Sequence, residues 1–256
     1  MRALARINVT PVKGTALVHP EAAMVSLTGI AENRRFYLVD ERGALFSGST
    51  FGQLVRIRSS YDPEDERLGL LFPDGTEVAG PADALGSSEV TDYYGRPVPS
   101  RMVEGLFGDA LSAYCGRPVR LLRCDRDGDG ADVEPLTIVS LASVDDLSTR
   151  GGRTDELDPR RFRITLELDG CAAYEEDTWH GRRVRVGDVT IRVDGQVPRC
   201  VVTTQDPDSG MKDWNTLTQI ARLRPRIPGG GLPFGMYARV DTPGSVRIGD
   251  PIDLDS

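Results

Sequence analysis

The recurrence of short apolar segments, each followed by turn residues, most constrains how this 256-residue chain can fold. Phe36–Asp40 is followed by the turn Glu41–Gly43, and Leu68–Phe72 by the turn Pro73–Thr76. Segments of this length with such turns between them predict β-strands joined by hairpins. The 28 glycines and 17 prolines favour the same interpretation because both residues suit turns. We therefore expect a mainly β fold with a few helices.

Other patterns predict further strands on both sides of a helical segment. Apolar residues recur with helical period between Met102 and Tyr114, and Gly116 and Pro118 would end that helix. A shorter helix is expected over Ser143–Leu147, with Ser143 as its N-cap. Alternating or β-branched residues predict additional strands at 1–9, 54–58, 119–123, 162–168, 184–186, 189–193, 200–204 and 236–240. The first group of strands suggests a small barrel or sandwich.

A charged, glycine-rich segment, Asp125–Gly130, separates the two groups of strands. Its six residues match the start of a calcium-binding loop, D-x-D-x-D-G. Such a loop needs a glutamate at its twelfth position, where this chain has Leu136. We therefore interpret the segment as a linker, and we expect one domain over residues 1–125 and a second over residues 131–256.

Charge and composition disfavour several classes of function. The net charge of −8 argues against a nucleic-acid partner. The chain contains no run of about 18 apolar residues, which a membrane-spanning helix would need. The chain shows no signal-peptide pattern, so a cytoplasmic location is expected, with no membrane partner. Four cysteines without a C-x2-C pair and only two histidines argue against a structural zinc or iron–sulfur site. Of the 31 basic residues, 29 are arginines, whose guanidinium groups suit phosphate.

The segment Pro198–Gly210 carries the most informative chemistry. Cys200 directly follows Pro-Arg, and β-branched residues then lead into a D-P-D-S-G turn. A thiol at the entrance of a strand would be held rigidly, and a neighbouring arginine would favour the thiolate, which is the form that binds metal or attacks. These residues alone leave open that Cys200 only fills the core, as we expect for Cys115, Cys124 and Cys171.

This segment resembles the signature of MOSC domains, the C-terminal domain type of molybdenum cofactor sulfurase. Motifs in the order of the mitochondrial amidoxime reducing component and its bacterial relatives are found at Asp158–Arg163, Leu168–Cys171, Tyr174–Trp179, Pro233–Tyr237 and Val246–Pro251. Pro11–Gly14 and Arg34–Val39 resemble the β-barrel domain that precedes MOSC in those proteins. The resemblance covers nearly the whole chain. It implies an N-terminal β-barrel-like domain followed by a MOSC β-barrel domain.

The resemblance also implies a site for a molybdenum–molybdopterin cofactor. Cys200 would be the metal ligand and the catalytic residue. The other cofactor-binding residues that it implies are Lys13, Gly14, Arg35, Ser140, Ser143, Arg163 and Arg199. Arg34 is a weaker candidate because strand alternation would send it to the opposite face from Arg35. Two departures stand out: Gly14 replaces a frequent serine, and Ile164–Thr165 replaces a common Pro-Asn pair.

The implied function is that of a molybdenum-dependent oxidoreductase. It would reduce small N-hydroxylated substrates, of the amidoxime or hydroxylamine type, by oxygen-atom transfer. The chain carries neither a ferredoxin-type cysteine pattern nor a G-x-G-x-x-G motif, so a separate electron donor of the ferredoxin or flavoprotein type is expected.

Two alternatives stay open. In one, Cys200 carries a persulfide or passes on the molybdenum cofactor, without turnover by this chain. In the other, the fold is a binding module for a different anion. Residues 214–226, which contain Pro225 and precede Pro228 and a run of three glycines, are interpreted as a mobile loop near the site.

Overall fold

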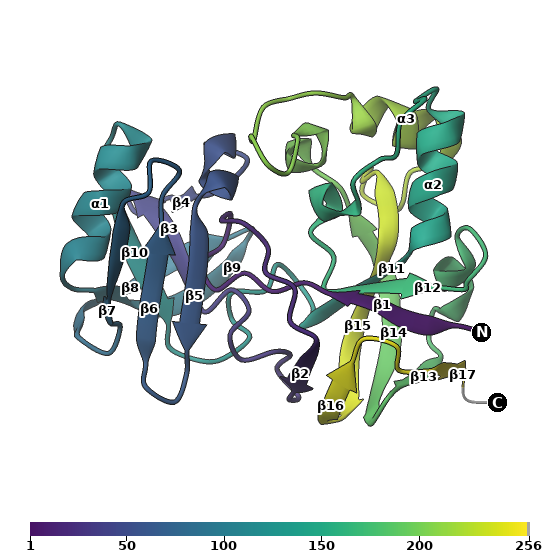
Figure 1. The fold of residues 1–256 in the computed structure, drawn as a ribbon, viewed down its shortest axis with the longest axis horizontal. Coiled ribbons are helices and arrows are strands. Elements are labelled where there is room, and N and C mark those ends of the chain that lie inside the picture. Colours follow the sequence, from purple (N-terminus) through teal and green to yellow (C-terminus); the bar gives the residue numbers. More distant parts are fainter. Residues whose placement is uncertain (255–256) are drawn as a thin grey trace.

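A computed structural model describes residues 1–254, and its strands form two bodies side by side (Figure 1). The first body contains a five-stranded sheet in the order β4-β3-β10-β9-β8 and a three-stranded sheet, β5-β6-β7. Its strands are β3 (Phe36–Asp40), β4 (Leu45–Phe46), β5 (Arg58–Asp62), β6 (Arg67–Leu71), β7 (Glu77–Pro81), β8 (Leu85–Tyr93), β9 (Arg96–Val103) and β10 (Val119–Cys124). Helix α1 (Leu106–Cys115) packs on them through Phe107 and Leu111 and ends at Gly116, where φ is 65°.

The second body is built on a seven-stranded sheet in the order β1-β12-β11-β15-β14-β13-β17. Its outer strands meet again, because Ala3 bridges Pro251 and the amide of Ile252 donates to the carbonyl of Arg2, so the sheet forms a nearly closed barrel. The strands of this body, including the separate pair β2–β16, are β1 (Ala3–Ile7), β2 (Ala22–Val25), β11 (Leu136–Ser140), β12 (Leu166–Asp169), β13 (Arg183–Val186), β14 (Val189–Pro198), β15 (Pro233–Thr242), β16 (Gly244–Arg247) and β17 (Ile252–Leu254). Helices α2 (Leu141–Arg150) and α3 (Thr216–Leu223) cover one end. The predicted mainly β class with a few helices is confirmed.

The first strands of the chain belong to the second body. β1 pairs with β12, and β2 pairs with β16. Leu4, Ile7 and Val25 are accordingly buried in the core of the second barrel. β1 and β2 therefore belong to the second body, whereas Val12 between them pairs with Phe36 and is buried in the core of the first body. The second barrel is complete only when the N-terminal strand is in place.

Two predicted strands are instead short 3-10 helices. Residues 54–58 fall largely in a 3-10 helix over Gly52–Arg56, which buries Leu54 and is followed by the buried Ile57. Residues 200–204 form a 3-10 turn over Val201–Thr204. The hydroxyls of Thr203 and Thr204 donate back to the carbonyls of Cys200 and Val201, at 3.0 and 2.7 Å. These bonds satisfy carbonyls that a sheet would otherwise use, so the β-branched residues turn.

Other element boundaries also differ from the sequence prediction. The helix expected from Met102 begins at Leu106, because Met102 and Val103 pair in the sheet and Gly105 has a φ of 102°. The predicted strand at 162–168 begins only at Leu166. The predicted mobile loop at 214–226 is wrong because it contains helix α3. Within residues 1–254, no helix is both long and apolar enough to cross a membrane.

Candidate functional site

A cavity of about 660 Å³ lies between the two bodies and is lined by residues from both. Five of the predicted site residues line this interbody cavity: Lys13, Gly14, Arg163, Arg199 and Cys200. Arg35, Ser140 and Ser143 are not among the residues that line it. The structure thus brings together residues separated by nearly 190 positions in the sequence, among them the thiol on which the cofactor hypothesis rests.

Cys200 is the exposed cysteine of the four in the chain, and its thiol borders the cavity. It lies where β14 ends and the 3-10 turn Val201–Thr204 begins, so the expected position at a strand entrance is wrong. Cys115, Cys124 and Cys171 are buried, as predicted, and burial raises the pKa of each of these three thiols. The reactive position is therefore specific to one cysteine.

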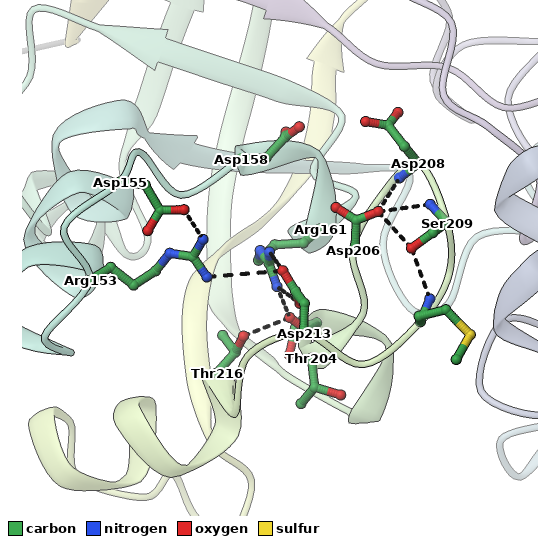
Figure 2. Close-up of polar contacts among 12 residues, drawn as sticks. Arg153, Asp155, Asp158, Arg161, Thr204, Asp206, Asp208, Ser209, Asp213 and Thr216 are labelled. Carbon is green, nitrogen blue, oxygen red and sulfur yellow. Dashed lines mark hydrogen bonds and ion pairs between the residues drawn. The ribbon is translucent and has the colours of Figure 1, made fainter.

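A buried ion pair holds the turn that follows Cys200 (Figure 2). Arg161 donates to both carboxylate oxygens of Asp213, at 3.1 and 2.9 Å, and to the carbonyl of Thr203 at 3.1 Å. Thr216 donates to the same carbonyl at 2.7 Å, and the amide of Asp213 donates to the carbonyl of Thr204. The Arg161 side chain is only 2% exposed. The turn is thus fixed from both sides by groups that belong to other segments.

Two cations on one wall of the cavity share a single carboxylate. Lys13 forms an ion pair with Asp132, and Arg34 donates to the other oxygen of Asp132 at 3.1 Å. Burial lowers the pKa of Lys13 to about 8, although Asp132 opposes that shift. Burial would raise the pKa of Asp132, but the charges of Lys13 and Arg34 hold it well below its usual value. Asp132 therefore remains ionised and neutralises only part of this wall.

Two further cations have no carboxylate partner among residues 1–254. Arg163 donates to the carbonyl of Thr15 at 2.8 Å, and burial lowers its pKa. Arg199 donates to the carbonyls of Phe234 and Phe162, at 2.7 and 2.9 Å, while its Nη2 is buried without any partner. Seven cationic side chains line the cavity against three carboxylates; Arg96, Arg160 and Arg161 pair with carboxylates outside the lining, so the uncompensated charge within residues 1–254 comes from Arg163 and Arg199. The cavity is consequently built to receive an anionic group.

Strained backbone is concentrated at this site. Five non-glycine residues in the described part of the chain have a positive φ, and Arg34, Tyr94 and Arg163 line the cavity. Arg34, with a φ of 55°, precedes β3, so strand alternation does not apply to it. The expectation that Arg34 points away from the site is therefore wrong. Arg35 instead forms an ion pair with Asp127 at 2.8 Å.

Ion pairs attach the linker, Asp125–Gly130, to the first body. Asp125, Asp127 and Asp129 pair with Arg101, Arg35 and Arg96 at 3.7, 2.8 and 3.7 Å. These carboxylates are thus engaged by arginines of the first body, in keeping with a linker and not with a calcium loop. No cluster of metal-ligating side chains is found within residues 1–254.

Ser143 lies in helix α2 within a buried polar network, whereas the hydroxyl of Ser140, just before the helix, is buried without a hydrogen-bond partner in the described residues. Ser140 is the N-cap of this helix, so the prediction that Ser143 caps it is wrong. Ser143 donates to Glu176 at 2.8 Å and accepts from the amide of Tyr174 at 2.7 Å. Burial raises the pKa of Glu176 to about 7. Both serines therefore have structural surroundings in the second body.

Gly14 explains one departure from the expected pattern. Its φ is 95°, and an added Cβ would lie 3.1 Å from Cδ1 of Leu54 and 3.2 Å from the amide nitrogen of Gly48. A serine at this position would be strained in the observed backbone. The other departure places Ile164 in the core and Thr165 at the cavity wall.

Comparison with protein families assigns both halves of the chain. Residues 1–101 match the MOSC N-terminal beta barrel domain, and residues 125–253 match the MOSC domain. The chain belongs to the MOSC domain family. This MOSC protein is 29% identical to mitochondrial amidoxime reducing component 2 from Bos taurus, over 95% of this chain and 80% of the relative. It is 25% identical to mitochondrial amidoxime-reducing component 1 from Xenopus laevis, over 97% and 81% of the two chains.

The MOSC protein also aligns with a solved structure at low similarity. The YUAD protein from Bacillus subtilis shares 12% identity with a TM-score of 0.46, covering 99% of this chain and 96% of that chain. The predicted resemblance to MOSC proteins and amidoxime reducing components is confirmed by the family matches and relatives. Family membership supports a function related to the molybdenum cofactor.

Three cavity residues were not selected, or were ranked low, from the sequence. Asp132, which follows the predicted linker, and Tyr94 carry no sequence signal that predicts a site, and alternation makes Arg34 a weaker candidate than Arg35. The residue pair Tyr94-Gly95 between two strand-like segments is a signal that could have marked a hairpin tip. Nothing local could have revealed that this tip faces Cys200 across the cavity.

Proposed function

We propose that this chain is a molybdenum-cofactor-dependent oxidoreductase that reduces N-hydroxylated substrates of the amidoxime or hydroxylamine type. The observation that carries the proposal is an exposed thiol, Cys200, at the edge of a cavity with an excess of cationic side chains. The names of the relatives, which describe amidoxime reducing components, support the reaction class.

The residues of the cavity fit an anionic cofactor that needs one protein thiolate. The unpartnered Nη2 of Arg199 is a buried donor without an acceptor in the chain, and such groups are costly unless a ligand satisfies them. Lys13, Arg34 and Arg163 would face the phosphate of a molybdopterin, for which guanidinium and ammonium donors are suited. Cys200 would supply a soft thiolate ligand to the metal.

When bound, the cofactor supplies two-electron oxygen-atom transfer chemistry. The chain itself contributes position and charge. The pair Arg161–Asp213 holds the turn that carries Cys200, and the three cations Lys13, Arg34 and Arg163 orient an anion toward it. Electrons would come from a separate donor protein, for which we propose a ferredoxin-type or flavoprotein-type partner.

Metal analysis of the protein made in a host that synthesises molybdopterin tests this proposal. We expect molybdenum in the wild type and in a Cys171→Ala control, whose thiol is buried away from the cavity, and its loss in Cys200→Ala. Turnover of an amidoxime with an artificial electron donor should follow the metal content. A wild type without molybdenum, or a Cys200→Ala variant that retains it, would contradict the proposal.

The same exposed thiol also suits a sulfur carrier, the second candidate. The intact mass of freshly isolated protein separates the two functions. A mass gain of one sulfur that disappears in Cys200→Ala, in protein without molybdenum, would support the carrier and not the reductase.

A further inference from the structure

Tyr94 occupies a backbone conformation that its side chain disfavours. Strands β8 and β9 pair up to Tyr93 and Arg96, so Tyr94 and Gly95 form a two-residue hairpin turn. The φ angles of Tyr94 and Gly95 are 58° and 88°, as a type I′ turn requires. Asn-Gly is the preferred pair for this turn, whereas a bulky residue with a positive φ is strained.

Burial of the Tyr94 side chain does not offset that strain. The residue is 65% exposed, while the preceding Tyr93 is fully buried and donates to the carbonyl of Gly130 at 2.8 Å. The Tyr94 ring meets the Tyr93 ring edge-on at 5.4 Å, but most of its surface stays exposed at a strained turn, and such strain collects at ligand sites.

The Tyr94 ring faces the site of proposed chemistry. It lines the interbody cavity with Cys200, and Nζ of Lys13 lies 5.5 Å from its centroid. A second exposed apolar side chain, Val133, lines the same cavity from the segment just after the linker and is 61% exposed. Pro198 and Val202, which flank Cys200 in sequence, complete an apolar wall.

We propose that Tyr94 is a specificity-determining residue whose ring packs against the flat, apolar body of the substrate. This inference rests on the proposed function for the identity of the reacting group, an N-hydroxylated nitrogen. The cations Lys13, Arg34 and Arg163 line the same cavity, and the ammonium of Lys13 lies beside the Tyr94 ring, so the ring would hold the substrate body next to the anionic cofactor.

Two amidoximes that share the reacting group test the inference. Benzamidoxime and acetamidoxime differ in a phenyl and a methyl group, so the ratio of their kcat/KM values reports on the ring contact alone. In the molybdenum-loaded protein, we expect Tyr94→Phe to keep the wild-type ratio and Tyr94→Asn to lower it by roughly five- to tenfold. Tyr94→Asn should also keep or raise the Tm, because asparagine suits the turn, so misfolding cannot explain its loss.

A binding measurement complements the kinetics and does not depend on turnover. Tyr94→Trp places a fluorophore at the hairpin tip, and we expect benzamidoxime, but not acetamidoxime, to shift its emission relative to the same titration of the wild type. Turnover in which Tyr94→Asn keeps the wild-type ratio would overturn the role of Tyr94 and leave the proposed function intact. A benzamidoxime-specific emission shift without molybdenum-dependent turnover would overturn the function and leave the aromatic contact standing.

Discussion

Lys13 is a buried cation whose pKa lies only slightly above neutral pH. Its ammonium lies among Asp132, Arg34 and the faces of two tyrosines, and the ring of Tyr93 is 4.9 Å away. Burial lowers the pKa of Lys13 from 10.5 to about 8. The contribution of Lys13 to the free energy of unfolding is therefore most favourable above about pH 10.5, where the lysine is neutral in both states. This contribution is lost as the pH falls through about 8, where the folded protein must bury the charged ammonium. Below pH 8 the fold therefore carries a cation whose burial is costly, and a bound anion would offset that cost.

The pH dependence of anion binding should reveal this charge. The charge of inorganic phosphate does not change above pH 8, where it is a dianion, so above about pH 8 its affinity should fall toward about tenfold per pH unit as Lys13 loses its proton. Isothermal titration calorimetry would measure it. Lys13→Arg should flatten the profile, and Lys212→Arg, at the other and exposed lysine, should not change it. Equal wild-type affinity at pH 7 and pH 10 would contradict the assignment.

At the scale of elements, the end of β14 and the 3-10 turn after it together fix the position of Cys200. The turn is too short to be stable by itself, so its geometry depends on Arg161, Asp213 and Thr216 from outside the turn (Figure 2). Asp206, at the next turn, accepts from the amide and hydroxyl of Ser209 at 2.8 and 2.7 Å. The first turn after the thiol is therefore fixed by side-chain donors to the carbonyl of Thr203, and the second by the carboxylate acceptor of Asp206.

Removal of the Asp213 carboxylate charge should loosen the turn Val201–Thr204 that follows Cys200. Asp213→Asn leaves Arg161 buried without an anionic partner, and we expect a loss of roughly 2 kcal/mol in the free energy of unfolding, since Asp213 is itself partly exposed. Urea denaturation would measure the loss, and Cys200 should react faster with iodoacetamide. Asp208→Asn, which alters an exposed pair with Arg160, should change stability by less than about 0.5 kcal/mol. Equal effects of the two variants would rule out a special role for Asp213.

At the scale of the whole molecule, the interbody cavity exists only because both bodies meet beside Cys200. Gln205 donates to the carbonyl of Gly48 at 2.9 Å, and Arg163 reaches the carbonyl of Thr15. Gly52 and Gly210 approach so closely that an added Cβ on Gly210 would collide with the carbonyl of Gly52. The cavity is consequently sensitive to any group that separates these two glycines.

Alanine substitutions at Gly210 and at the exposed turn residue Gly75 should separate the effect of the contact between the bodies from that of backbone strain. Gly210 and Gly75 have positive φ angles of 71° and 88°, but no atom lies within 4 Å of an added Cβ at Gly75. We expect Gly75→Ala to cost about 1 kcal/mol of unfolding free energy from backbone strain. Gly210→Ala should cost roughly 2–4 kcal/mol because the bodies must also move apart. Equal urea midpoints for the two variants would show that the close contact of Gly210 with Gly52 adds nothing to the cost of Gly210→Ala.

Local patterns in the sequence determined the class of fold and the positions of several elements. Phe36–Asp40 and its turn, the helix that ends at Gly116, and the buried Cys115 and Cys124 all follow from periodicity and turn chemistry. Those signals involve neighbours within a few residues, so they can be read without the fold. The resemblance to MOSC proteins likewise located Cys200, although the same residues wrongly predicted a strand there.

Only the tertiary structure decided which residues share the cavity. β1 joins the second barrel, Arg34 in place of Arg35 lines the cavity, and Tyr94 faces the thiol from another body. These placements depend on single backbone torsions, such as the φ of 55° at Arg34, and on hydrogen bonds between segments more than 100 residues apart. A periodic pattern contains neither kind of information, because both arise from packing that forms only when the whole chain has closed.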